Sequence, residues 1–178
     1  MLDLSVAYNR YRFLGDEFLT WLWYLVETDQ DAFRAVDPDC STLEIGNRIV
    51  LENRKGKSIE RITIKGDDAG LEEGKLALKK GALVTELAFI FKTGEHQWEF
   101  SLKGESLNVS SLKTPGPALP QSAEEIEAFL LDKAQRFNKI LRFLEILYKT
   151  FIQVRITGKW SSKITPVIKK WVSSVDHK

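Results

Sequence analysis

The chain has 178 residues, of which 43% are hydrophobic and 29% charged, a composition that suits a folded domain and excludes a disordered polypeptide. It contains no run of about 18 uncharged apolar residues, and its charged amino terminus lacks the apolar segment of a signal peptide. We therefore expect a single domain over residues 1–178, located in the cytoplasm and not in a membrane. Cys40 is the only cysteine, so an internal disulfide cannot form. One cysteine and two histidines also cannot supply the four ligands of a structural zinc site.

The stretch GDEFLTWLWYLVET at residues 15–28 predicts a first helix over residues 16–27, with Asp16 as its N-cap and one broad apolar face. Trp23 and Tyr24 widen this face beyond what a single packing surface needs. Core packing explains most of the face, and one of these two rings is expected at a second interface or on the outside. There it could contact a protein partner or stack on a base.

From residue 42 onward apolar and polar residues alternate, which predicts β-strands. Residues 42–53 and 58–66 are interpreted as a three-stranded meander that turns at Gly46-Asn47 and again at RKGK. A short helix that ends at Gly81 follows, and residues 82–94, 96–104 and 106–113 predict three further strands. The sequence therefore predicts an antiparallel sheet of about six strands.

A proline-rich connection leads to a capping box made by Ser122 and Glu125, which predicts the start of a helix. Apolar residues then recur at three- and four-residue intervals from about residue 123 to 152, with basic residues on the opposite arc. A short terminal helix is expected from about residue 165, with Pro166 in its first turn. The predicted fold class is α+β, with the sheet packed by the aromatic amino-terminal helix and the long carboxyl-terminal helix.

The sequence contains no recognisable catalytic pattern. His96 falls in a predicted turn, His177 lies next to the end of the chain, and the segment GLEEGKLALKKG lacks the order of a phosphate-binding loop. We therefore expect a protein that is not an enzyme, with no cofactor, no metal and no small-molecule substrate.

The charge distribution points to a polyanion as partner. Eleven basic and two acidic residues give the segment from Lys133 onward a net charge of +9, so residues 1–132 carry −8 of the overall +1. Exposed basic side chains neutralise phosphates without reading bases, and Trp160 and Trp171 could stack on bases or close the core. The predicted nucleic-acid-binding residues are Lys133, Arg136, Lys139, Arg142, Lys149, Arg155, Lys159, Lys163, Lys169 and Lys170.

An alternative interpretation is a scaffold or interaction domain that oligomerises through the amino-terminal helix, with Trp23 and Tyr24 at the interface. In that case the basic residues would only keep the long helix soluble. Both interpretations allow a homodimer.

Four segments resemble the carboxyl-terminal part of the recombination-associated RdgC proteins: LTWLW, LKKGALVTELAFIF, WEFSLKGESLNVSSLK and FLLDKAQRFNKILRFLEILYKTF. The resemblance covers roughly residues 18–155, and GALVTELAF and Arg136-Phe137 hold the places of two of the family's motifs. RdgC proteins bind DNA without much sequence preference, form ring-shaped homodimers around duplex DNA and restrain strand exchange by RecA. The resemblance therefore implies non-specific binding to duplex DNA and a nucleoid-associated protein. It does not include the family's amino-terminal portion, on which ring closure depends.

Overall fold

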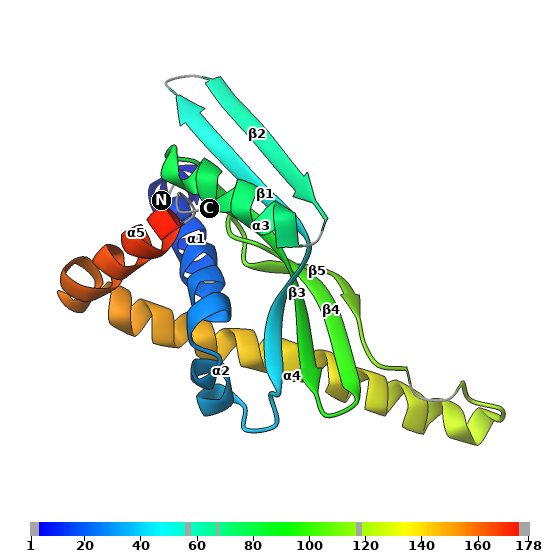
Figure 1. Cartoon of the computed structure of the whole chain (residues 1–178). Helices are drawn as coiled ribbons and strands as arrows, with labels where there is room; N and C mark the ends of the chain where they lie inside the picture. The colour runs from blue at the N-terminus through cyan, green and yellow to red at the C-terminus, as the bar shows by residue number, and fades with distance from the viewer. Residues whose placement is uncertain (1–3, 56–57, 67, 117–118, 175–178) are drawn as a thin grey trace.

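The computed structural model describes residues 4–55, 58–66, 68–116 and 119–174. In these residues a five-stranded antiparallel sheet combines with five α-helices, which confirms the α+β fold class. The strand order is β2-β1-β3-β4-β5, with bounds Thr42–Lys55 for β1, Ser58–Lys65 for β2, Leu83–Thr93 for β3, His96–Lys103 for β4 and Asn108–Lys113 for β5. Figure 1 shows α1 (Leu4–Thr28), α2 (Asp31–Val36) and α5 (Thr165–Ser173) to the left of the sheet, whereas α4 (Ala123–Arg155) runs across its lower part and extends past its right edge.

The sheet has five strands because Gly46-Asn47 is a bulge and not a turn. Strand β1 continues through it, and its register against β3 shifts between Ile45 and Ile49. A Cβ on Gly46 would lie 3.0 Å from the Cβ of Ala88, so the two strands approach closely there. A bulge increases the local twist, and β1 can thereby pair with β3 along most of its length and with β2 in its second half. The prediction of six strands was therefore wrong at this position.

Two helices cover the inner face of the sheet, as predicted. Helix α1 (Leu4–Thr28) packs on β3, and α4 (Ala123–Arg155) packs beside it. Rings from each element meet in the core: the Phe91 and Phe143 ring centroids are 4.9 Å apart, and those of Phe18 and Phe151 are 5.3 Å apart. The apolar periodicity of these helices therefore indicated the face that each buries.

Helix α1 begins at Leu4, twelve residues earlier than the predicted start, and Asp16 lies in its middle and not at its N-cap. The predicted helix started directly after Gly15, but here Gly15 lies within the helix and allows a close crossing. A Cβ on Gly15 would lie within 1.8 Å of the carbonyl oxygen of Gly104, in the β4–β5 turn. Tertiary packing therefore requires a glycine at this position, although glycine has a low helix propensity.

The other predicted helices are confirmed. Helix α3 (Asp68–Lys79) is followed by Gly81 with φ of 93°, and Ser122 caps α4 by accepting a hydrogen bond from the Glu125 amide. Helix α5 (Thr165–Ser173) has Pro166 in its first turn and follows one π-helical turn at Trp160–Ile164. A short helix α2 (Asp31–Val36), which was not predicted, buries Phe33 against Phe143. No helix in the described residues is long and apolar enough to span a membrane.

Candidate nucleic-acid interface

Four of the ten predicted phosphate-binding residues are paired with acids. Arg136 donates from Nε to Asp132 at 2.8 Å and from Nη1 to the Pro115 carbonyl at 3.1 Å. Lys149 bonds Glu145 at 2.6 Å, and this contact holds the pKa of Glu145 below its ordinary value. Both pairs follow the i, i+4 spacing that favours ion pairs on a helix surface.

The other two pairs join α4 to distant segments. Lys139 lies 3.2 Å from Asp37 and 3.4 Å from Asp39, in the loop that follows α2. Arg155 donates from Nε to Glu17 of α1, and its guanidinium lies 5.5 Å from the ring centroids of Phe13 and Trp160. These cations contribute to the packing of α4 on its neighbours, so the basic face of α4 is weaker than its sequence suggests.

Six of the predicted residues form no ion pair with any residue that the structure describes. Lys133 and Arg142 are exposed on α4, and the Lys133 ammonium lies 5.9 Å from the Phe129 ring centroid. The remaining four lysines are exposed after α4: Lys159 directly precedes the π-helical turn, Lys163 lies in it, and Lys169 and Lys170 lie in α5. The unpaired charge is therefore concentrated after α4 and not along it.

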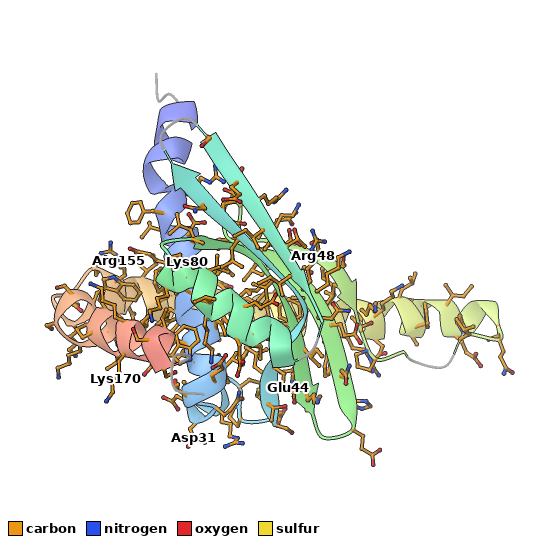
Figure 2. All side chains as sticks on the ribbon, turned by 45° about the horizontal axis from the view of Figure 1, so that its top comes forward. Asp31, Glu44, Arg48, Lys80, Arg155 and Lys170 are labelled. Atoms are coloured by element: carbon orange, nitrogen blue, oxygen red, sulfur yellow. The ribbon has the colours of Figure 1, made fainter. Side chains whose placement is uncertain are left out.

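Helix α3 adds two lysines that the sequence analysis missed. It packs against α5, and its end carries Lys79 and Lys80, both exposed. Figure 2 shows Lys80, Arg155 and Lys170 at the same end of the molecule, where Figure 1 places the end of α3 beside α5. The adjacent pair Lys79-Lys80 was visible in the sequence, but its position beside α5 depends on the fold. We call this group the lysine end: Lys79, Lys80, Lys159, Lys163, Lys169 and Lys170.

A cavity of about 530 Å³ opens within the lysine end, between α1, α3 and α5. Lys79 and Lys169 line it together with Asp16 and Glu17 of α1, and Trp160, Ile168 and Val172 give it an apolar wall. Glu17 is already bonded to Arg155. The carboxylates lie in the recess and the lysines are exposed, so phosphates would meet the lysines first.

The tryptophans have different roles at this end. Trp171 is 8% exposed and donates its indole N–H to Glu27 at 2.9 Å, so it closes the core over α5. Trp160 is half-buried, with its ring against Phe151 at 5.4 Å between centroids, and part of it lines the cavity. Of the two, only Trp160 has surface that could contact a base.

Trp23 lies in the core and offers no interface. It is fully buried, its indole N–H donates to Glu27 at 2.8 Å, and its ring lies 5.6 Å from that of Trp171 in an edge contact. Tyr24 is half-buried and packs its ring edge-on against Trp171 as well. The expectation that α1 exposes an aromatic surface at Trp23 is therefore wrong: α5, which the helical periodicity of α1 could not reveal, covers it.

Glu27 links three elements at this position. It accepts the indole N–H groups of Trp23 and Trp171 and forms an ion pair with Lys75 of α3, whose ammonium also lies 5.3 Å from the Trp171 ring centroid. A partly buried carboxylate with several donors is well satisfied. This cluster fixes α3 and α5, and with them the lysine end, to α1.

The described residues contain no grouping of histidine, cysteine, aspartate and glutamate that could hold a metal ion. His96 is exposed, but it is the first residue of β4, paired with Thr93, and not a turn residue as predicted; His177 lies outside the described residues. Cys40 is buried, and burial together with the nearby Asp37 carboxylate raises the pKa of its thiol to about 11. This thiol does not have the lowered pKa of a reactive cysteine.

Comparison of the chain with protein-family models, with curated proteins and with solved structures finds no match.

Proposed function

We propose that this protein binds nucleic acid, in particular duplex DNA, without sequence specificity and through the phosphates. The observation that carries the proposal is the unpaired charge after α4, on Lys159, Lys163, Lys169 and Lys170 of the lysine end. Residues 146–175 contain six basic residues and no acid, and four of the six are exposed lysines without an ion pair in the described structure. Such a surface attracts phosphates by charge and releases their counterions.

The same surface has no means of reading a sequence. The lysine end consists of lysines with the half-buried Trp160 beside them, and lysine acts as a point charge where arginine would give a planar fork for base edges. The RdgC resemblance supports the same class of partner. We accordingly propose a role in recombination or in a related process on DNA, with the protein located on the nucleoid.

The proposal is tested by removing charge from the lysine end and, as a control, the same charge from elsewhere. If Lys159, Lys163, Lys169 and Lys170 each contact one phosphate, a plot of log affinity against log salt concentration should have a slope of about −3.6, at about −0.9 per contact. Neutralising three of the lysines should reduce the slope to about −0.9. The variant carries Lys163→Gln, Lys169→Gln and Lys170→Gln.

The control removes three exposed charges from the strands, with Arg61→Gln, Lys65→Gln and Lys103→Gln. It has the same net charge as the lysine-end variant and should keep the slope of the original protein. If both variants lose the same affinity, binding depends on net charge alone and the lysine end is not the site.

A further inference from the structure

The cavity between α1, α3 and α5 has two chemically different zones. Lys79 and Lys169 line it and are exposed, so positive charge surrounds its opening. Further in, Ala82, Ile168 and Val172 form an apolar wall. The volume of about 530 Å³ lies in the range of small-molecule sites and is far larger than the voids left by ordinary side-chain packing. The cavity therefore has room for a flat ring system with its substituents.

One wall of the cavity is an aromatic ring that its neighbours hold in place. The Trp160 ring lies edge-on to Phe151, at 5.4 Å between centroids, and the Arg155 guanidinium lies 5.5 Å from the Trp160 centroid. Trp160 is nevertheless only half-buried, and part of it lines the cavity. Because its position is fixed by these contacts, a planar ligand can pack on it without first ordering the side chain.

The polar groups of the cavity suit a ligand that donates hydrogen bonds. Asp16 lines it from α1, and its Oδ2 accepts from Arg54, whereas its Oδ1 is buried without a hydrogen-bond partner among the residues that the structure describes. Thr165 and Ser173 line it from α5, with hydroxyls that form no hydrogen bond to a described residue. The neighbouring Glu17 carboxylate adds negative charge, so the interior disfavours an anionic group and favours an uncharged one with N–H donors.

We propose that the cavity takes up one unpaired nucleobase while the phosphates next to that base lie on the lysine end. This inference rests on the proposed function, because the same strand must bind the lysines. The polarity of the cavity matches that of a nucleotide, which carries its negative charge on the phosphate and a flat, uncharged ring beyond the sugar. Every base has at least one N–H donor on its pairing edge and an apolar face for stacking, so the cavity accepts all four bases without reading a sequence.

The first test compares the anisotropy of three labelled duplexes of about 30 base pairs at low salt. One duplex is intact, one contains a single unpaired nucleotide in its middle, and one contains an abasic nucleotide at the same bulge. The two bulged duplexes have equal numbers of phosphates and differ only in the base. The protein should bind the bulge with a base at least about tenfold more tightly than the abasic bulge, because stacking of one base on an aromatic side chain contributes roughly that factor.

The second test closes the cavity. Ser173 is exposed and lines the cavity, so Ser173→Trp places a large ring in it. The adjacent Ser174 is exposed as well but does not line the cavity, and Ser174→Trp is the matched control. Ser173→Trp should abolish the preference for a base over an abasic nucleotide and leave the affinity for the intact duplex and its salt slope unchanged. Ser174→Trp should keep the preference.

The last measurement identifies the source of the base. A nucleoside monophosphate carries the same base and phosphate, and it is added in excess to the bulged duplex. Loss of the base preference would identify a free nucleotide as the ligand, and retention would identify the strand; both place a base in the cavity.

Equal affinities for the two bulged duplexes, or equal effects of the two tryptophan variants, would overturn the proposal. If the intact duplex is still bound with the expected salt slope in that case, the proposed function stands without the base site. Absence of binding to all three duplexes would contradict both.

Discussion

Asp16 shows how a charged side chain predicted at a surface cap becomes a buried structural group. It is 2% exposed, and its Oδ2 accepts a hydrogen bond of 2.9 Å from Arg54 of β1. Glu52 bonds the same arginine and also Arg12 of α1. Burial raises the pKa of Asp16 above its ordinary value, although Arg54 acts in the opposite direction. The charged form therefore costs free energy in the folded state.

The raised pKa of Asp16 predicts a specific pH dependence of stability. Between the ordinary pKa of 3.8 and the higher folded value, the native state binds the extra proton, so this group adds stability as pH falls and removes it as pH rises. Asparagine does not titrate, so the Asp16→Asn variant lacks this pH-dependent contribution to stability. Urea unfolding should show the original protein gaining stability relative to the variant between about pH 7 and pH 4. A difference in unfolding free energy that does not change with pH would contradict this prediction.

Cys40 provides a second prediction for a single side chain. Its thiol is buried and has a pKa of about 11, so at about pH 8 only about 0.1% would be thiolate even if a reagent could reach it. Reaction with a disulfide reagent should be more than about 100-fold slower in the native protein than in concentrated guanidinium chloride. Rapid labelling of the native protein would show that the segment around Cys40 opens.

Among the elements, α1 is positioned by a contact that the sequence does not reveal. Gly15 is a poor helix former, and an isolated helix would gain about 1 kcal/mol from Gly15→Ala. In the protein, however, the new methyl group would meet the backbone of Gly104 at 1.8 Å. Backbone atoms cannot give way as a side chain can, so the substitution should destabilise the protein by about 1–3 kcal/mol in urea unfolding.

Gly158→Ala is the matched control for this prediction, since nothing lies within 4 Å of the added methyl group. It should change the unfolding free energy by less than about 0.5 kcal/mol. If Gly15→Ala were as stable as the control, α1 would not cross the β4–β5 turn as closely as described.

The elements with regular spacing could be predicted from the sequence, and the irregular ones could not. The alternation in β3 and β4 and the three- and four-residue spacing in α4 each gave the correct element within a few residues. Gly46 and Gly15 were misread, because a glycine at a bulge or a close crossing has the same local pattern as one at a turn or helix end. Tertiary contacts decide between these possibilities.

At the scale of the whole molecule, the excess of basic residues was predictable, but its place was not. Lys139 pairs with Asp39 across 100 residues, and Arg155 with Glu17 across 138. Such partners meet only in the folded chain, and they leave less unpaired charge on α4 than the sequence suggested. Lys159, Lys163, Lys169 and Lys170 have no acid within five residues in the sequence and form no ion pair with the described residues.

The most direct test of the nucleic-acid proposal is the anisotropy of a labelled random-sequence duplex of about 30 base pairs, titrated at about 50 and 200 mM salt. With four phosphate contacts, the fourfold rise in salt should weaken binding about 150-fold. Two duplexes of unrelated sequence should give the same affinity at each salt concentration. Absence of binding at the lower salt concentration, or an affinity that barely changes between the two, would contradict the proposal that the lysine end binds phosphates.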